Sequence, residues 1–343
     1  MPLCAGRPRL GSHRIGFALC ALVIAAGSAA QSRASPSGTG DCRFPRSASD
    51  AGDYLYATPT TLDHIGRVVA PVMINGQGPF RFVIDTGANS SVISPALAQR
   101  LNLTLSAADS MTLSGVTGSA LVPTVKIDTL AAGDIALRDL TLPVIDSVLG
   151  GADGVLGVEG FEGTKIRIDF ARDRLTIARS RGWAADDGFQ VAPVRFHFGR
   201  LLVADVLVGS VWARAVIDTG AQRTLGNEAL REALRAQARR DASVTHTEVI
   251  GATPERQRGD LSEAPPIKIG RMTIEKVQIT FGDIYVFRQW ELDKTPALLI
   301  GMDVLGILDT LAIDYRRREI QVRLRPPGTA ENWAARDWDH LCG

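Results

Sequence analysis

Short apolar runs separated by turn residues recur along most of the chain, and they predict a protein built from β strands. Residues 68–74 and 81–84 flank an Asn-Gly-Gln-Gly-Pro segment, which is a strong turn signal between two strands. Further strands are expected at 121–127, 135–144, 166–170 and 174–178 in the first half, and at 201–207, 213–217, 267–269, 272–281 and 311–315 in the second.

Helical signals are few and short. Residues 95–101 follow Ser94, a favourable N-cap residue, and 228–240 is rich in Ala, Arg and Glu. Many short strands with little helix indicate an all-β architecture.

The hydrophobic pattern contains an internal repeat. The hexapeptide Val-Ile-Asp-Thr-Gly-Ala occurs twice, with its aspartates at Asp85 and Asp218. Each copy is followed by an apolar-apolar-Gly segment ending at Gly157 or Gly301, and then by a strand with an Ile-Asp-aromatic sequence. Three landmarks therefore recur in the same order at similar spacing, which indicates two copies of one structural unit.

The composition of the chain mainly excludes certain classes of protein. A chain of 343 residues suggests about two domains. The 38 basic and 37 acidic residues give a net charge of +1, which lacks the basic excess of a nucleic-acid-binding protein. No apolar run reaches about 18 residues, so no ordinary membrane span is expected.

The N-terminus resembles an export signal. Arg7, Arg9 and Arg14 precede a short apolar stretch at 15–26, and small residues allow cleavage after Ala30. We expect residues 1–30 to be a signal peptide and 31–53, rich in Ser, Gly, Pro and Arg, to be a flexible linker. The protein is then periplasmic or secreted, and bacterial; an uncleaved signal anchor is the alternative.

Two cysteines, Cys42 and Cys342, remain after signal cleavage. In an oxidising compartment they can form a disulfide that links the chain ends, or they can stay as two free thiols. No cysteine or histidine cluster has metal-ligand spacing, so neither a metal nor a cofactor is expected. The histidines of the mature chain are His64, His197, His246 and His340.

An aspartate that ends an apolar strand is a candidate catalytic residue. Gly87 and Gly220 allow the chain to turn sharply and bring backbone N–H groups close to the carboxylate, while Thr86 can brace the loop. Two such carboxylates facing each other cannot both ionise easily, so they share one proton. One member then activates a water molecule as general base, and the other protonates a carbonyl oxygen as general acid.

These residues make the sequence similar to the aspartic proteases. The Asp-Thr-Gly-Ala form resembles the retropepsin-like branch, and two copies in one chain resemble the bilobal pepsin-type arrangement. The resemblance implies a bilobal acid-protease fold, two tandem retropepsin-like β-barrel lobes with an active-site cleft between them. We place the lobes at 54–185 and 186–325, followed by a tail at 326–343.

The resemblance also implies residue roles. Asp85 and Asp218 correspond to the catalytic pair, and Thr86 and Thr219 to the threonines that brace the two loops against each other. The active-site loops further include Gly87 and Gly220, and the supporting glycine motif includes Gly157 and Gly301.

Two glycine-containing segments match flaps, the hairpins that close over substrate in this family. They contain Gly115, Val116, Thr117 and Gly118 in the first half, and Gly251 in the second. Neither has the tyrosine of the pepsin flap, which argues against pepsin-like substrate handling. Plain surface hairpins are the alternative.

The sequence thus predicts a monomeric aspartic endopeptidase that acts on peptide or protein substrates. Two alternatives remain open: a non-catalytic peptide-binding module on the same fold, and an assembly in which each lobe pairs with a lobe of another chain. Asp128 and Asp309 also precede a threonine but lack the glycine, so we expect them to be ordinary strand-end residues.

Overall fold

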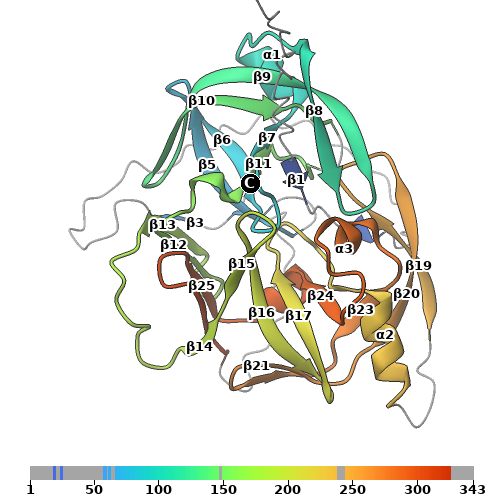
Figure 1. The fold of residues 1–343 in the computed structure, drawn as a ribbon. Helices are drawn as coiled ribbons and strands as arrows, with labels where there is room; N and C mark the ends of the chain where they lie inside the picture. The colour runs from blue at the N-terminus through green and yellow to red at the C-terminus, as the bar shows by residue number, and fades with distance from the viewer. Residues whose placement is uncertain are drawn as a thin grey trace, which may run out of the picture.

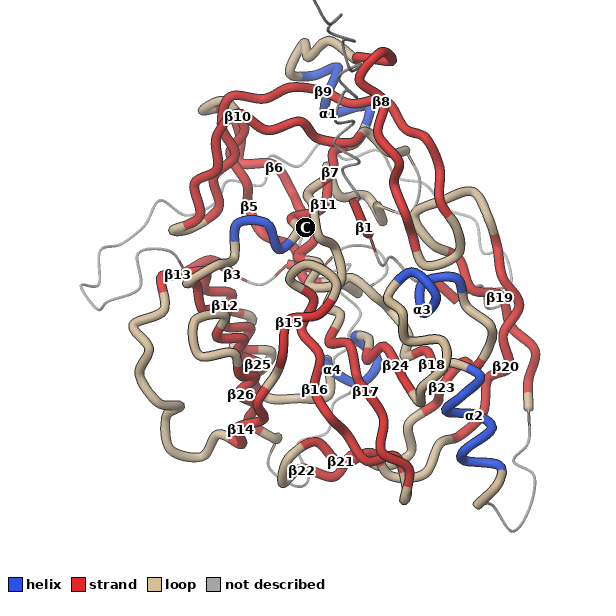
Figure 2. Tube along the Cα trace, in the orientation of Figure 1, coloured by secondary structure: helices blue, strands red, loops and turns tan. Residues whose placement is uncertain are grey.

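A computed structural model describes residues 18–20, 24–25, 57–59, 61–62, 66–146, 149–237 and 244–325. Strands dominate this part of the chain, and the helices are short (Figure 2). The all-β prediction is confirmed. The helices described are α1 (Pro95–Arg100), α2 (Glu228–Arg235), α3 (Tyr285–Gln289) and α4 (Met302–Leu305), with one 3₁₀ turn, η1 (Val158–Gly160).

The first lobe, at the top of Figure 1, is built on a nine-stranded sheet. Two of its strands, β8 (Ser106–Gly115) and β9 (Ser119–Ala132), form a long hairpin. In order across the sheet the strands are β1 (Ala18–Cys20), β8 (Ser106–Gly115), β9 (Ser119–Ala132), β5 (Val68–Ile74), β6 (Gln77–Ile84), β11 (Gly154–Leu156) and β7 (Val92–Ile93), with β10 (Ile135–Pro143) on β9 and β4 (Thr61–Leu62) on β5.

The second lobe contains an eleven-stranded sheet with its own hairpin, β19–β20. Its strands are, in order, β2 (Ile24–Ala25), β19 (Thr245–Ile250), β20 (Arg256–Glu263), β23 (Gln278–Phe281), β18 (Leu225–Gly226), β24 (Ala297–Ile300), β17 (Val211–Ile217), β16 (Leu201–Val208), β21 (Ile267–Ile269) and β22 (Met272–Ile274), with β15 (Arg195–His197) on β16.

The sequence repeat folds in the same way in both lobes. The strand that ends at the first motif, β6, pairs in parallel with β11, and Ile84 lies opposite Leu156. The strand that ends at the second motif, β17, pairs in parallel with β24, and Ile217 lies opposite Ile300. Because the apolar-apolar-Gly segment supplies β11 and β24, both landmarks of the repeat meet at one end of each lobe.

A third, six-stranded sheet joins the two lobes. Its central strands come from different halves of the chain and run antiparallel, with Ile168 opposite Leu311. The lobes are therefore not independent domains. The strand order is β14 (Gln190–Pro193), β26 (Glu319–Arg323), β25 (Thr310–Asp314), β12 (Thr164–Asp169), β13 (Arg174–Arg179) and β3 (Ala57–Pro59).

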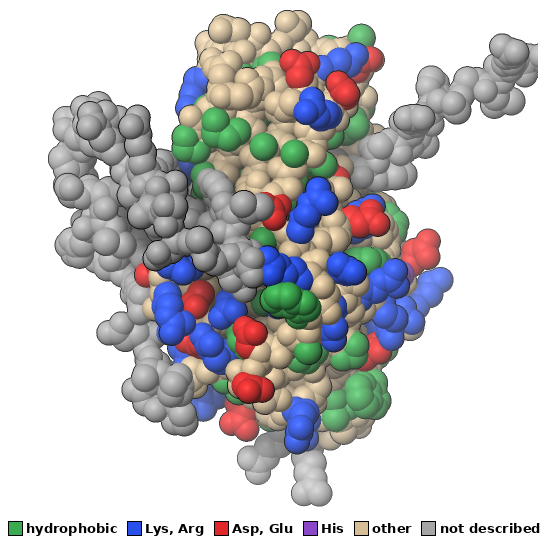
Figure 3. Space-filling model, turned by 90° about the vertical axis from the view of Figure 1, so that its left-hand side faces the viewer, with side chains coloured by type: hydrophobic (Ala, Val, Ile, Leu, Met, Phe, Trp, Pro, Cys, Tyr) green, Lys and Arg blue, Asp and Glu red, His purple; other side chains and the backbone are tan. Residues whose placement is uncertain are grey.

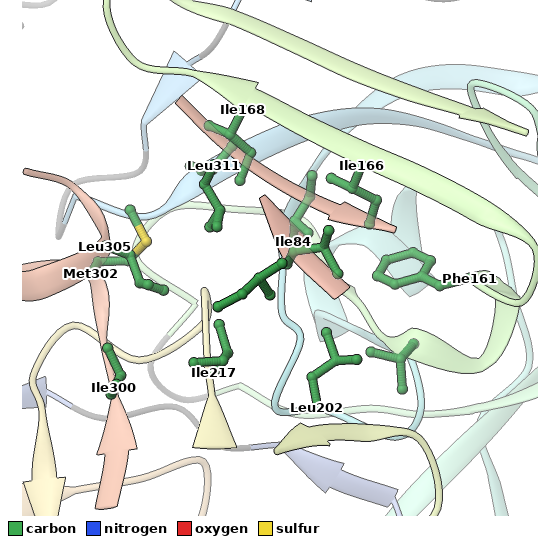
Figure 4. Packing of buried hydrophobic residues seen from close by; sticks show 14 of the residues in the cluster. Ile84, Phe161, Ile166, Ile168, Leu202, Ile217, Ile300, Met302, Leu305 and Leu311 are labelled. Carbon is green, nitrogen blue, oxygen red and sulfur yellow. The ribbon is translucent and has the colours of Figure 1, made fainter. Parts of the chain in front are cut away.

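One hydrophobic core runs through this junction. It includes fully buried side chains from all three sheets. Figure 4 shows Ile84 and Ile217, the last residues of β6 and β17, in the middle of the group, with Leu202, Ile168 and Leu311 around them. Packing around the ends of β6 and β17 fixes the positions from which the two motifs leave their strands.

The structure corrects two element boundaries. The helix expected at 228–240 begins after the N-cap Asn227 but ends at Arg235, next to Leu234, which packs against the core, and residues 235–237 are exposed. The strand expected at 272–281 is divided into β22 and β23. Lys276 has a φ of 58°, a left-handed conformation that interrupts an extended strand. Helix α1 begins as expected, with the Ser94 hydroxyl accepting a hydrogen bond from the backbone N–H of Leu97.

Several sequence predictions fall outside the described residues. They are most of the signal peptide 1–30, the linker 31–53, the tail 326–343, and the pairing of Cys42 with Cys342. The lobe boundary at 185/186 stays a prediction. On the part of one face that Figure 3 leaves visible, basic and acidic side chains are intermixed over the lower lobe.

Replacing Ile168 with Ala should destabilise the whole protein, because Ile168 is fully buried in the sheet that joins the lobes. We expect a loss of about 2–5 kcal/mol in the free energy of unfolding, measured by urea denaturation. The matched control is Val191→Ala on β14 of the same sheet, where the side chain is 42% exposed and the change should stay within about 0.5 kcal/mol. Equal effects would show that the junction is not a core.

Candidate active site

Asp85 and Asp218 each occupy the first position after a buried strand. The backbone N–H of Asp85 donates to the carbonyl of Leu156 (3.1 Å), and that of Asp218 donates to Ile300 (3.0 Å). Both residues are fully buried. The parallel strands β11 and β24 therefore fix the start of each loop.

Each carboxylate accepts hydrogen bonds from its own loop. Gly87 N–H donates to Asp85 Oδ1 (2.8 Å), while Gly220 and Ala221 both donate to Asp218 Oδ1 (2.8 and 3.1 Å). A buried carboxylate needs such donors, because burial removes its hydration. The loop glycines thus supply the N–H groups that the sequence predicts.

The two carboxylates lie face to face, each against the glycine of the other motif. A Cβ atom added to Gly87 would stand 2.3 Å from Asp218 Oδ2, and one added to Gly220 would stand 2.4 Å from Asp85 Oδ2. Only a residue without a side chain fits at either position. The pair that the sequence predicts, 133 positions apart, is therefore brought together by the fold.

Thr86 and Thr219 bind the two loops to each other reciprocally. Each backbone N–H donates to the hydroxyl of the other threonine (3.2 and 3.1 Å). Each hydroxyl then donates to a strand carbonyl of the opposite lobe: Thr86 to Ile217 and Thr219 to Ile84, both at 2.7 Å. Four buried hydrogen bonds thus fix the separation of the two aspartates.

Burial and proximity shift the ionisation of this pair. Burial raises the pKa of Asp218 well above its ordinary value near 3.8, and the charge of Asp85 and a hydrogen bond with it raise it further. The N–H donors of Gly220 and Ala221 act in the opposite direction. Asp218 therefore favours the protonated form beside Asp85, as expected for two carboxyl groups that share one proton.

The glycine motifs support the loops from behind. Val158 N–H donates to the carbonyl of Ala88 (2.9 Å), and Met302 N–H donates to that of Ala221 (2.8 Å). A Cβ atom on Gly157 would stand 2.5 Å from the Ser90 backbone. Gly301 is similarly close to the backbone of Arg223, at 2.7 Å.

The sequence reasoning missed four residues behind the loops. Ser91 and Thr224 stand six positions after the two aspartates, and Glu159 and Asp303 stand two positions after the supporting glycines. Ser91 N–H donates to Glu159 Oε1 (2.7 Å), and Thr224 N–H donates to Asp303 Oδ2 (3.0 Å). The signal that could have found them is their equal offset in both copies of the repeat.

Tyr315 was also missed. Its ring packs against Phe161 and Phe196 (centroids 5.3 and 6.2 Å apart). Burial raises the pKa of its hydroxyl well above 10, and the charge of Asp85 raises it further. Phe170 holds the equivalent position in the first copy, so a hydroxyl group is present at this position of the repeat in the second copy only.

Both predicted flap segments are hairpin turns, and their tips contact each other. Gly115–Gly118 connect β8 to β9, and Gly251 begins the turn between β19 and β20. The hydroxyls of Thr117 and Thr253 lie 3.3 Å apart. A Cβ atom on Gly251 would stand 2.9 Å from Thr117 Oγ1.

Each hairpin tip also packs against the opposite lobe. Val116 packs in the apolar cluster of the second lobe with Leu201 and Phe287, and its carbonyl accepts from Val286 N–H of α3 (3.0 Å). Ala252 packs in the cluster of the first lobe. The two hairpins are therefore interlocked in this structure.

The remaining candidates lie away from the pair. Asp128 is exposed on β9, and Asp309 forms an ion pair with Arg323, so neither belongs to the site. His197 contacts the carbonyl of Trp290, and His246 contacts Asp260. Within the described ranges, no three His, Cys, Asp or Glu side chains are grouped to hold a metal. In the same part of the chain, no helix is long and apolar enough to cross a membrane.

Comparison with protein families gives a match in both halves of the chain. The family model described as aspartyl protease matches residues 70–159 and 204–304, more than half of the chain. The two matched segments contain one motif each. No curated protein matches the chain.

Replacing Thr86 with Val should strongly destabilise the protein, because it leaves Thr219 N–H and the Ile217 carbonyl buried without partners. At about 1–3 kcal/mol for each of these two unpaired groups, we expect a loss of about 2–6 kcal/mol in the free energy of unfolding. Thr86→Ser retains the hydroxyl and should lose much less. If the Val and Ser variants are equally stable in urea denaturation, the reciprocal bonds contribute little.

Replacing Asp218 with Asn should stabilise the protein increasingly as pH rises. Since the pKa of Asp218 is raised in the fold, its contribution to stability is complete below the unfolded pKa near 3.8 and is lost as pH rises through the folded pKa. Asn is neutral throughout, so the stability difference from wild type should grow from acidic to neutral pH.

Thermal unfolding at a series of pH values measures this difference. Asp128→Asn, at an exposed carboxylate, is the control and should follow the wild-type curve. Parallel curves for Asp218→Asn and wild type would contradict the raised pKa.

Proposed function

The chain belongs to the aspartyl protease family, and from this premise we propose that it is an endopeptidase whose catalytic pair is Asp85 and Asp218. The observation that carries the proposal is their geometry: two buried carboxylates, each packed against the glycine of the other loop. General acid–base hydrolysis by such a pair requires neither a metal nor a covalent intermediate.

In the proposed reaction the pair starts with one proton, held on Asp218, whose raised pKa favours it. Ionised Asp85 takes a proton from a water molecule, and the water oxygen attacks the carbonyl carbon of the peptide. Asp218 gives its proton to the carbonyl oxygen. Asp85 then gives its proton to the nitrogen as the C–N bond breaks, and a hydroxyl group of the tetrahedral intermediate returns a proton to Asp218, which yields a carboxylic acid and an amine.

The preferred substrate is an extended peptide bound beneath the two hairpins. Two short N-terminal strands of the chain itself, which pair with the hairpins, support this choice. Ala18–Cys20 pairs in parallel with Leu113–Gly115 of β8, and Ile24–Ala25 pairs antiparallel with residues 249–250 of β19. Extended segments of the chain therefore pair with the strand edges of both hairpins, parallel to β8 and antiparallel to β19, so these edges suit an extended peptide.

We further propose that the protein is of the two-motif, bilobal type and works as a monomer. One chain supplies both aspartates and both threonines of the reciprocal contact, so a second chain is not needed to complete the pair. The division into lobes 54–185 and 186–325, and export directed by residues 1–30, are parts of the same proposal. No observation favours a non-catalytic binding module, since both motifs are intact.

Asp85→Asn and Asp218→Asn should each reduce kcat/KM for peptide cleavage by about 10²–10⁴-fold, because each removes one partner of the acid–base pair. Cleavage of a diverse peptide library by purified protein, from acidic to neutral pH, measures the loss. Asp128→Asn is the matched control and should retain wild-type activity, since Asp128 is exposed on β9. Full activity in either active-site variant would refute the assignment.

A further inference from the structure

Behind each catalytic loop, one acidic side chain holds the residue that ends the loop. Glu159 does so in the first lobe and Asp303 in the second, at the same position after the supporting glycine. We propose that these two acids are positioning residues that hold the catalytic loops in place as hydrogen-bond acceptors. The proposal rests on the proposed function, in which the loops carry Asp85 and Asp218.

In the first lobe the acid closes a small hydrogen-bonded ring. Ser91 N–H donates to Glu159 Oε1 (2.7 Å), and Gly157 N–H donates to Ser91 Oγ (3.0 Å). Ser91 is fully buried, so no bulk water can replace the carboxylate as acceptor. The other oxygen, Glu159 Oε2, is buried and has no hydrogen-bond partner among the described residues.

In the second lobe, both carboxylate oxygens of Asp303 accept hydrogen bonds. Thr224 N–H donates to Asp303 Oδ2 (3.0 Å), and the Thr224 hydroxyl donates to Asp303 Oδ1 (2.7 Å). Gly301 N–H in turn donates to the Thr224 hydroxyl (3.2 Å). Thr224 is fully buried. Asp303 therefore accepts hydrogen bonds from both the backbone N–H and the hydroxyl of Thr224.

These contacts complete the fixation of each loop. In the first lobe, Leu156 holds the start of the loop through Asp85 N–H and Val158 holds its middle through the Ala88 carbonyl. Glu159 holds its end at Ser91. Catalytic groups must be placed to within about 0.5 Å, and a displacement of about 1 Å can reduce the rate about 10²-fold. A loop released at its end loses that precision.

The acids act as acceptors rather than as charges. Burial raises the pKa of both Glu159 and Asp303, while the hydrogen bonds that they accept lower it. In an amide only the oxygen accepts hydrogen bonds, because the NH₂ group is a donor. Gln or Asn can therefore replace one accepting carboxylate oxygen but not both. Glu159→Gln should therefore work almost as wild type, whereas Asp303→Asn should lose the bond from the Thr224 hydroxyl.

The first experiment measures kcat and KM for Glu159→Ala, Glu159→Gln, Asp303→Ala and Asp303→Asn, with active sites counted by titration with a tight-binding transition-state mimic. We expect the Ala variants to lose about 10–100-fold in kcat per active site with KM nearly unchanged. Asp303→Asn should be intermediate and Glu159→Gln near wild type. The control is Glu162→Ala, an exposed residue of the same segment that pairs with Arg200.

Two outcomes would overturn the proposal. If the Ala variants have fewer titrated sites but unchanged kcat per site, the acids serve folding alone. If Glu159→Gln is as defective as Glu159→Ala, the charge and not the accepting oxygen is required.

The second experiment needs no catalytic activity. Hydrogen–deuterium exchange should be faster in residues 85–91 of Glu159→Ala but unchanged in 218–224, and Asp303→Ala should show the reverse. Unchanged exchange, or equally faster exchange in both loops, would refute lobe-specific positioning. If the wild type cleaves no peptide, the proposed function fails, while this exchange pattern still decides whether the acids hold the loops.

Discussion

The structure depends on keeping two carboxyl groups buried and facing each other. Like charges in a low-dielectric site repel strongly, and each carboxylate also loses its hydration. The protein meets this cost locally with N–H donors from Gly87 and Gly220 and with the raised pKa of Asp218, which keeps one proton on the pair. The threonine hydrogen bonds then hold the two loops at a fixed separation.

The duplication explains how one chain builds this arrangement. Each lobe ends a strand at its aspartate and places a parallel strand beside it, so the same local solution is used twice. The copies are not identical around the pair. Tyr315 stands in the second copy where the first copy has Phe170. Asp303 binds Thr224 through both carboxylate oxygens, whereas Glu159 Oε2 has no hydrogen-bond partner among the described residues. Differences of this kind are one way in which two chemically equivalent carboxyl groups acquire different pKa values.

The hairpins connect the lobes a second time, through contacts separate from those of the six-stranded sheet. Val116 of the first lobe packs in the cluster of the second, and Ala252 of the second packs in the cluster of the first. The hydrogen bond from Val286 to the Val116 carbonyl ties one hairpin tip to α3. Access to the pair in this arrangement depends on contacts between the lobes and not on one lobe alone.

The sequence by itself determined the all-β class, the repeat, the two aspartates and the glycines beside them, because these depend on local hydrophobic pattern and on turn chemistry that neighbouring residues specify. It misplaced the end of α2 and joined β22 to β23, where burial and a single left-handed residue decide the boundary. Only the tertiary structure brought Glu159 to Ser91 and Asp303 to Thr224. These contacts join residues 68 and more positions apart in the chain, and such distances follow from strand pairing and packing rather than from any local pattern.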